Sequence, residues 1–524
     1  MAFTHRFGAA VAALSVAGVL VAAQSADDPG ILTPPAPHEP RINGPSVYGT
    51  RPGRPFLYRI PATGDRPMTF SVKGLPEGLT LDGPTGIIRG TVANRTPRSY
   101  PTTLVARNAR GRTQRAFTIV VGDTLALTPP MGWNDWYTFY EHPTDELMRR
   151  AAGIMVTSGM ADHGYQYVNI DDSWMGKPKS NDPDLSGPAR DERGMINPNR
   201  RFPDMKAMTG YIHGLGLKAG LYTSPGPRTC AGFYGSYDHE ALDAARFVEW
   251  GFDFLKYDWC SYDEVAPKGS VPEAERLQKP YRLMGGLLQK QPRDIVFNLC
   301  QYGMGEVWTW GGDVGGHSWR TTGDLGLEKG QRLPGFYAIG FRNAEHADHA
   351  RPGRWNDPDY ILIGYVGNAH SISDPPKPTS LTQHEQYSYM SMWVLMAAPL
   401  FYSGDITRLD PFTLNVLNNA EVIAVDQDSL GRQARIVRKT DDEFVLAKPM
   451  EDGSVAVGLF NLAETPREIA VSAADVGLNT GPRLRVRDLW RWKELDPVAG
   501  RYAATVGRHG VMLVRMWPAA SKTR

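Results

Sequence analysis

The stretch F-D-F-L-K-Y-D, residues 252–258, has the length and composition of a short strand that carries a lysine and ends in an aspartate. Longer segments with helical patterns separate it from similar runs, and such alternation is typical of a parallel sheet built from βα units. Eight strands in regular alternation predict an α/β fold, a closed (β/α)8 TIM barrel, in preference to an open sheet. The other seven runs lie at residues 131–133, 165–171, 217–223, 295–300, 318–322, 354–356 and 399–403.

The segments on either side of the predicted barrel have the pattern of β domains. Residues 46–122 contain short β-branched or aromatic runs separated by Gly, Pro and Asp clusters, as in an all-β sandwich. Residues 433–524 lack the helical pattern, and two alternating runs flank Asp452-Gly453, a two-residue hairpin signal. We therefore expect the barrel at residues 123–432, followed by a C-terminal antiparallel β-sandwich. The Pro-rich residues 24–45 are expected to form an extended linker.

The first residues indicate the compartment. His5 and Arg6 precede an apolar run, residues 7–23, that is rich in Ala and Val and ends in small residues. This pattern predicts a signal peptide at residues 1–23 with cleavage after Ala23, and a retained anchor is the alternative. No later stretch approaches the ~18 unbroken apolar residues that a spanning helix needs. We expect a secreted or periplasmic protein without integral membrane association.

Charge and metal-ligand types narrow the class of partner. Lys and Arg number 57 and Asp and Glu number 56, so the formal charge of +1 offers no basic field to collect nucleic acid. An uncharged small molecule is the expected partner. The 3 Cys and 12 His show no C-x-x-C or H-x-x-x-H spacing, so we expect no metal and assign no cofactor. An odd number of Cys in an oxidising compartment allows one disulfide and one free thiol.

Polar side chains cluster at the carboxyl ends of the predicted strands, where barrels of this type have their active sites. A single acidic residue at a strand end is most often a helix cap or an ion-pair partner. Several charged groups on one rim instead favour a binding site for a neutral ligand with many hydroxyls, with Trp136 stacking on a ring. The clustered residues are Trp136, Asp171, Asp172, Tyr222, Lys256, Asp258, Gln301, Arg320, Asp324, Asp357 and Asp359.

Seven motifs in this part of the chain resemble, in order, those of glycoside hydrolase family 27. This family contains α-galactosidases and α-N-acetylgalactosaminidases, and it implies a (β/α)8 barrel followed by an antiparallel β domain. Residues 70–92 also resemble the immunoglobulin-like (Ig-like) modules attached to bacterial surface proteins and glycosidases, which makes residues 46–122 an Ig-like β-sandwich. The seven motifs are T-P-P-M-G-W-N-D-W (128–136), V-N-I-D-D-S-W (168–174), L-K-Y-D-W-C (255–260), S-W-R-T-T-G-D (318–324), W-N-D-P-D (355–359), M-A-A-P-L-F (396–401) and V-I-A-V-D-Q-D-S-L-G (422–431).

The resemblance implies a retaining glycosidase in which Asp258 of L-K-Y-D is the nucleophile and Asp324 of W-R-T-T-G-D is the acid/base. A retaining enzyme needs two carboxyl groups about 5 to 5.5 Å apart, and the ends of the fourth and sixth strands can supply them. Lys256 lies two residues before Asp258, on the same face of its strand, and is expected to keep the nucleophile ionised. Asp324 is expected to need a less polar setting that raises its pKa.

The same resemblance assigns the cysteines and the remaining rim residues. It pairs Cys230 with Cys260 and leaves Cys300 as the free thiol, whereas an inert buried thiol at Cys230 is the alternative. The residues implied to bind the sugar are Asp171 and Asp172 for the axial O4 and for O6, Lys256 for O3 and O4, Arg320 for O2, Trp136 and Tyr222 as walls, and Asp359 as a further contact.

One motif departs from the family. Where many of its α-galactosidases have C-E-W, with the glutamate on the sugar's 2-hydroxyl, this chain has C-Q-Y at residues 300–302, followed by two glycines at 303 and 305. Gln301 carries no charge but can accept or donate a hydrogen bond. The predicted function is a retaining α-galactosidase acting on oligosaccharides or glycoconjugates, with β-L-arabinopyranosidase and α-N-acetylgalactosaminidase as alternatives. The presence of both Asp171 and Asp172 favours galactose.

A catalytically inactive sugar-binding surface protein is an alternative of another class, and the Ig-like module makes it reasonable. A decayed site commonly loses one catalytic carboxylate, whereas this chain has both Asp258 and Asp324. The sequence therefore favours an enzyme, and it leaves the oligomeric state open.

Overall fold

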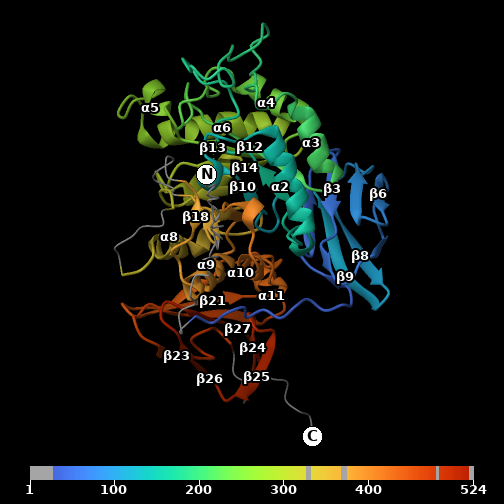
Figure 1. Ribbon diagram of the computed structural model, residues 1–524, viewed down its shortest axis with the longest axis vertical. Coiled ribbons are helices and arrows are strands. Elements are labelled where there is room, and N and C mark those ends of the chain that lie inside the picture. Colours follow the sequence, from blue (N-terminus) through green and yellow to red (C-terminus); the bar gives the residue numbers. More distant parts are fainter. Residues whose placement is uncertain (1–27, 326–331, 368–374, 479–482, 519–524) are drawn as a thin grey trace, which may run out of the picture.

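The computed structural model describes residues 28–325, 332–367, 375–478 and 483–518, so the predicted signal peptide lies outside the described residues. A barrel forms the centre of the molecule, an N-terminal β module packs at one side of it, and a C-terminal β domain packs below it in the view of Figure 1. Among the helices of the described residues, none is both long enough and apolar enough to cross a membrane.

Eight short parallel strands form the barrel, and their order in the sheet follows their order in the chain. Ile361, which follows the seventh strand, pairs in parallel with Tyr402 of the eighth and closes the circle. This arrangement confirms the predicted α/β barrel. The strands are β10 (Met131–Asn134), β11 (Tyr167–Asn169), β12 (Lys218–Thr223), β13 (Phe254–Asp258), β14 (Val296–Cys300), β15 (Ser318–Arg320), β16 (Trp355–Asp357) and β19 (Leu400–Tyr402), and a separate small pair is β17 (Tyr365–Val366) with β18 (Lys377–Pro378).

Helices surround the sheet, and side-chain caps fix where two of them begin. The Thr144 hydroxyl accepts a hydrogen bond from the backbone N–H of Leu147 and starts α2 (Asp145–Thr157). Thr382 and Glu385 form a capping box at the start of α9 (Gln383–Leu395), which is buried between the barrel and the C-terminal domain. The other α-helices described are α1 (Trp136–Phe139), α3 (Met205–Gly214), α4 (Glu240–Trp250), α5 (Tyr262–Val265), α6 (Glu273–Lys290), α7 (Val307–Trp310), α8 (Gly335–Ala344), α10 (Pro411–Leu417) and α11 (Ala420–Asp426).

The N-terminal module is a sandwich of two sheets around its own apolar core. Tyr58 from one sheet stacks on Phe117 from the other, with ring centroids 4.7 Å apart. One sheet has the order β2 (Val47–Thr50), β9 (Gly111–Val121), β8 (Arg98–Asn108), β5 (Thr69–Lys73), the other has β3 (Phe56–Arg59), β7 (Ile87–Gly90), β6 (Leu79–Asp82), and β1 (Arg41–Ile42) pairs separately with β4 (Ala62–Thr63).

Of the segment before the module, the described residues 28–40 lack regular structure, in keeping with their Pro-rich composition, but they are tied to the barrel. The backbone N–H of Gly30 donates to the side chain of Gln383 at 2.8 Å, and the N–H of Leu32 donates to the Tyr387 hydroxyl at 3.0 Å. Both acceptors belong to α9. Residues 30–32 of the predicted linker therefore lie against this helix, whereas residues 41 and 42, also predicted as linker, form β1 and pair with β4.

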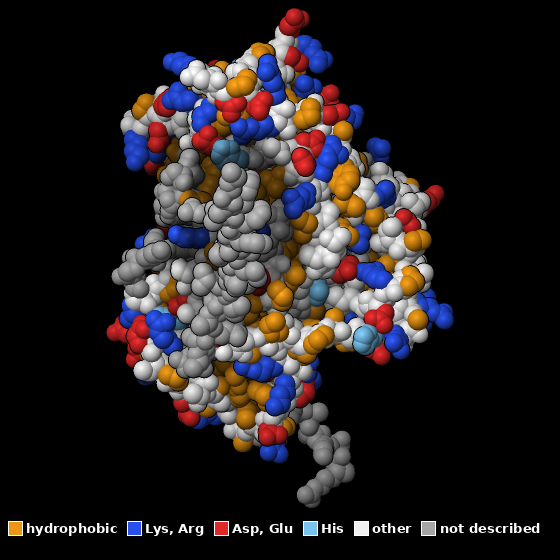
Figure 2. All heavy atoms as spheres, viewed as in Figure 1, with side chains coloured by type: hydrophobic (Ala, Val, Ile, Leu, Met, Phe, Trp, Pro, Cys, Tyr) orange, Lys and Arg blue, Asp and Glu red, His pale blue; other side chains and the backbone are white. Residues whose placement is uncertain are grey.

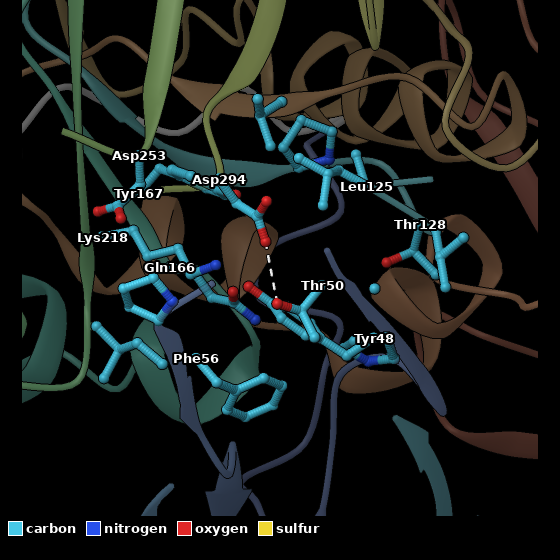
Figure 3. Close-up of a pocket in the computed structure, with 18 of the residues that line it drawn as sticks. Tyr48, Thr50, Phe56, Leu125, Thr128, Gln166, Tyr167, Lys218, Asp253 and Asp294 are labelled. Carbon is cyan, nitrogen blue, oxygen red and sulfur yellow. Dashed lines mark hydrogen bonds between the residues drawn. The ribbon is translucent and has the colours of Figure 1, made fainter. Parts of the chain in front are cut away.

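The N-terminal module packs against the floor of the barrel, by which we mean the end where the strands begin (Figure 3). The Asp294 carboxylate, just before β14, accepts hydrogen bonds from the Thr50 hydroxyl and the Arg51 backbone N–H, both at 3.0 Å. The Lys218 ammonium, at the start of β12, lies 4.6 Å from the centroid of the Tyr48 ring. A cavity of about 500 Å³ remains between the module and the floor.

The C-terminal domain is an antiparallel sandwich, as predicted. Its hairpin turns at Asp452-Gly453, where Gly453 has a φ of 78°, a conformation that glycine adopts readily. The Trp490 indole N–H donates to the Ser391 hydroxyl of α9 at 2.9 Å and ties the domain to the barrel. One sheet has the order β20 (Arg435–Lys439), β21 (Glu443–Pro449), β22 (Val455–Asn461), β27 (Val511–Pro518), β24 (Leu484–Asp488), β25 (Lys493–Val498), and the other pairs β23 (Arg467–Ser472) with β26 (Arg501–Val506).

Candidate active site

The predicted site residues lie at the carboxyl end of the barrel, and the strand register sets them level with one another. Tyr222 of β12 lies opposite Lys256 of β13, and Asp258 at the end of β13 lies opposite Cys300 of β14. Because side chains alternate along a strand, Lys256 and Asp258 share one face. Both side chains are buried.

Asp258 is held by two phenols. The Tyr302 hydroxyl donates to its Oδ1 at 2.7 Å, and the Tyr222 hydroxyl donates to its Oδ2 at 3.0 Å. Burial raises the pKa of Asp258, the positive charge of Lys256 opposes that rise, and the negative charge of Asp324 adds to it. The net shift is upward, so Lys256 offsets only part of the cost of burying this carboxylate.

Lys256 forms its ion pair with Asp171 and not with Asp258. Its Nζ lies 2.9 and 3.2 Å from the two oxygens of Asp171. Burial alone would lower the pKa of Lys256, but the interactions with Asp171, Tyr360, Cys300 and Asp258 together outweigh it, and the pKa lies well above its usual value. The positive charge of Lys256 still lowers the pKa of Asp258 against burial, the direction expected of a residue that keeps the nucleophile ionised, although its ion-pair partner is Asp171.

Arg320 joins two further carboxylates. Its Nη1 lies 3.1 Å from Oδ1 of Asp324, and its Nη2 lies 3.0 Å from Oδ2 of Asp359. The Asp359 carboxylate also accepts a hydrogen bond from the Tyr137 hydroxyl at 2.7 Å. The side chain of Asp324 is 48% exposed. The less polar setting expected for an acid/base is thus absent, because Asp324 faces solvent and pairs with a cation.

Asp171 and Asp172 follow β11 and are both buried, but their partners differ. Besides Lys256, the Asn134 amide donates to Oδ2 of Asp171 at 2.8 Å, and the Tyr360 hydroxyl donates to the same oxygen at 3.1 Å. Asp172 instead accepts backbone N–H groups, including that of Ala231 at 2.9 Å. Burial raises the pKa of Asp172 to about 7. No cation pairs with this carboxyl group among the contacts of the described chain.

Gln301 and Trp136 make few contacts with the other rim residues. The Gln301 Nε2 donates to the backbone carbonyl of Met304 at 2.9 Å, while its Oε1 is buried without a hydrogen-bond partner among the described residues. Trp136 begins α1, is half-buried, and packs edge-on against Tyr140 with ring centroids 5.9 Å apart. A buried acceptor without a donor can be satisfied by a ligand hydroxyl.

Two of the cysteines are bonded beside Asp258. Cys230 and Cys260 form a disulfide with Cα atoms 5.0 Å apart, which is the pairing that the family resemblance implies. Their sulfurs and a carboxylate oxygen of Asp258 lie within 4.8 Å of one another, but bonded sulfurs are not the thiolates that bind metals. Cys300 is free and buried, and Arg320 Nη1 donates to its sulfur at 3.7 Å.

Sequence reasoning found Tyr222 but missed three other tyrosines of the site. The Tyr302 hydroxyl donates a hydrogen bond to Asp258. The Tyr360 hydroxyl donates to Asp171, and the Tyr137 hydroxyl donates to Asp359. A tyrosine has no distinctive spacing, because it is equally at home in an apolar core. The available signals were their positions: Tyr360 directly follows the W-N-D-P-D motif, and Tyr302 lies in the altered C-Q-Y motif.

Family models match the chain in three parts. The model described as Alpha galactosidase A matches residues 128–428, and the one described as the Alpha galactosidase C-terminal beta sandwich domain matches residues 440–516. An Ig-domain model matches residues 39–122.

Curated relatives and solved structures agree with these models. Alpha-galactosidase 2 of Arabidopsis thaliana is 36% identical over 394 residues, which cover 75% of this chain and 90% of that protein. A crystal structure from Bacteroides fragilis, assigned as an alpha-galactosidase/melibiase, has a TM-score of 0.82 at 35% identity and covers 93% of this chain and 98% of its own. That of alpha-galactosidase I from Mortierella vinacea has a TM-score of 0.67 at 27% identity, covering 76% and 99%. The chain belongs to the alpha-galactosidase (melibiase) family of glycoside hydrolases, family 27.

Proposed function

We propose that this protein hydrolyses terminal α-D-galactosyl residues of oligosaccharides or glycoconjugates with retention of configuration, with Asp258 as nucleophile and Asp324 as acid/base. The observation that carries the proposal is the contrast between the two carboxyl groups. Asp258 is buried and held through both oxygens, while Asp324 is half-exposed yet near enough for its charge to raise the pKa of Asp258. A fixed nucleophile and an accessible proton carrier are what double displacement needs.

In the first step, a carboxylate oxygen of Asp258 attacks the anomeric carbon, and the bond from that carbon to the leaving oxygen breaks. Asp324 gives its proton to the leaving oxygen, so the aglycone departs as a neutral alcohol. In the second step, ionised Asp324 takes a proton from water, which attacks the same carbon and releases Asp258 as a carboxylate. Two inversions at one carbon give net retention.

The other rim residues bind the sugar in this proposal. Asp171 and Asp172 accept hydrogen bonds from O4 and O6, Lys256 donates to O3 and O4, and Arg320 donates to O2. Trp136 and Tyr222 form the walls, and Asp359 orients Arg320 through its ion pair. Figure 2 shows acidic and basic side chains interspersed on the drawn face.

Azide rescue tests the two catalytic roles. Asp258→Gly and Asp324→Gly should each lower kcat by roughly 10²-fold or more on p-nitrophenyl α-galactoside while the thermal unfolding profile is kept. With Asp324→Gly, azide should attack the galactosyl-enzyme and give the α-azide; with Asp258→Gly, it should attack the substrate and give the β-azide. Azide products of one configuration from both variants would refute the assignment.

A substrate panel tests the sugar. We expect p-nitrophenyl α-galactoside to be hydrolysed faster than the β-L-arabinopyranoside and the α-N-acetylgalactosaminide. The presence of Asp172 supports this order, because a group placed for O6 gains nothing from a pentose. A faster rate on the arabinopyranoside would move the proposal to that activity.

We further propose that residues 1–23 are removed on export to a secreted or periplasmic location, and that the domains divide near residues 123 and 433. The disulfide between Cys230 and Cys260 supports an oxidising compartment. N-terminal sequencing of the exported protein should begin at Gln24.

A further inference from the structure

Tyr302 lies in a turn whose shape its neighbours fix. Its φ of 63° is in the left-handed region, and Gly303 follows with a φ of 82°. A Cβ at Gly303 would lie 2.3 Å from the carbonyl oxygen of Thr321, so any larger residue would collide with that backbone. The Gln301 amide closes the turn by donating to the Met304 carbonyl at 2.9 Å. This strained, closed turn places the Tyr302 ring at one defined position.

The phenol of Tyr302 meets the nucleophile at that position. Its hydroxyl lies 2.7 Å from Oδ1 of Asp258 and 3.7 Å from the sulfur of Cys230. Burial and then the charge of Asp258 raise the pKa of Tyr302 far above its usual value, so the phenol stays neutral and acts as a donor. The Arg320 guanidinium lies 6.0 Å from the ring centroid.

The two carboxylate oxygens of Asp258 therefore have separate donors. Oδ1 is held by Tyr302 and Oδ2 by Tyr222, whose hydroxyl also lies 3.4 Å from the Cys260 sulfur. Two donors on opposite oxygens fix the rotation of the carboxylate plane, which decides the angle of attack on the anomeric carbon. One donor alone leaves that rotation free.

We propose that Tyr302 is a positioning residue for the reaction, and that its phenol orients Asp258 and favours the ionised form of this carboxyl group. The proposal rests on the role given to Asp258 under the proposed function. It gives the altered C-Q-Y motif a purpose, because an indole N–H in place of the phenol has a different reach. The hydrogen bond from Tyr302 is among the influences that lower the pKa of Asp258 against its burial.

The pH dependence of kcat/KM reports the carboxyl group of the free enzyme. Tyr302→Phe removes the donor and keeps the ring, so the pKa of Asp258 should rise and the acid limb should move upward by about half a pH unit or more. At neutral pH, kcat/KM should fall roughly tenfold or more, as expected for loss of a hydrogen bond to a charged group. The groups that face Asp258 and stay unchanged are Lys256, Tyr222, Asp171, Cys300, Arg320 and Asp324.

A second variant should shift the acid limb of the pH profile in the opposite direction. 3-Fluorotyrosine incorporated at position 302 has a more acidic phenol and is a stronger donor, so the acid limb should move downward. A residue with a merely structural role would not shift the limb in opposite directions. An unmoved acid limb in both variants would overturn the proposal.

Tyr257→Phe is the matched control. Tyr257 precedes Asp258 on β13, is buried where Tyr302 is half-buried, and its hydroxyl has no hydrogen-bond partner among the described residues. Its loss should leave the acid limb in place, and a shift equal to that of Tyr302→Phe would also overturn the proposal. The azide test distinguishes failure of this proposal from failure of the proposed function. If Asp258→Gly gives the β-azide but the variants at position 302 do not shift the acid limb, Asp258 is still the nucleophile and only the role of Tyr302 is refuted.

Discussion

Asp253 lies just before β13 and Asp258 lies at its other end, yet burial has opposite outcomes for these two carboxyl groups. Asp253, on the floor of the barrel, accepts from His213 at 2.7 Å and from Arg293 at 2.7 Å. Burial alone would raise the pKa of Asp253, but its interactions with His213, Arg293 and Lys218 hold it at about 2. Among the described residues, only phenols donate hydrogen bonds to the Asp258 carboxylate, and its pKa is raised.

The surroundings of these carboxyl groups also differ between the floor and the carboxyl end of the barrel. On the floor, Asp294 is bonded to Thr50 and Arg51 of the N-terminal module, and Lys218 lies over the Tyr48 ring (Figure 3). The buried charges there hold two domains together. At the carboxyl end, Asp172 is buried and pairs with no cation of the described residues. A buried carboxyl group without a cation, such as that of Asp172, is available to a substrate.

The largest expected effect is on activity, and it should separate the two ends. Asp172→Asn should lower kcat/KM on p-nitrophenyl α-galactoside by roughly 10- to 100-fold, because a charged acceptor for a sugar hydroxyl is lost. Asp253→Asn, the same change on the floor, should leave kcat/KM within about twofold. Steady-state kinetics on both variants decide this. Equal losses would show that the floor also shapes the catalytic site.

The next effect is on stability and depends on pH. The pKa of Asp253 is about 2 in the folded chain against an ordinary 3.8, so its contribution of about 2 kcal/mol is present above pH 4 and lost as the pH falls through 2. Asp253→Asn should lower the free energy of unfolding by about that amount at pH 7, with the gap closing between pH 4 and pH 2.

Asp172 should show the reverse trend in the same denaturation series. Its pKa is raised to about 7, so its stabilising influence is complete below pH 4 and is lost as the pH rises through 7. Asp172→Asn should make the fall in the free energy of unfolding between pH 4 and pH 7 smaller. Parallel pH profiles for Asp253→Asn and Asp172→Asn would break the distinction between the floor and the catalytic end.

The sequence was sufficient to predict the barrel because the patterns that indicate its strands are local. A run such as 252–258 shows by itself that a strand ends in Asp258, and parallel strands bring such ends together. The partner of each charge is not local. It depends on how loops from different strands fold over the rim. This folding decides that Lys256 pairs with Asp171, that Asp324 faces solvent, and that Tyr302 contacts Asp258.

The docking of the N-terminal module was beyond the sequence for the same reason. Asp294 and Lys218 are ordinary strand-start residues, and their contacts with Thr50 and Tyr48 exist only once the module is in place. The Pro-rich segment likewise gave no sign that Gly30 would bond to α9.

The smallest expected effect concerns Gln301, whose buried Oε1 accepts no hydrogen bond from the described residues. A free 2-hydroxyl can satisfy this oxygen, whereas a 2-acetamido group needs space that the Gln301 side chain fills. N-acetylgalactosaminides should therefore be poorer substrates than galactosides by more than the tenfold that about 1.4 kcal/mol represents.

Gln301→Ser should narrow that gap by a few-fold, because it opens room beside C2, but it also removes the bond from Nε2 to the Met304 carbonyl. Gln301→Glu is the matched control, since it keeps the size of the side chain and should keep the discrimination. The measurement is kcat/KM on the two p-nitrophenyl α-glycosides for the wild type and both variants. If Gln301→Glu narrows the gap as much as Gln301→Ser, the space that Gln301 fills does not set the preference at C2, and the wall must be sought elsewhere. If the wild type hydrolyses both glycosides equally well, the unpaired oxygen plays no part in recognising the 2-hydroxyl.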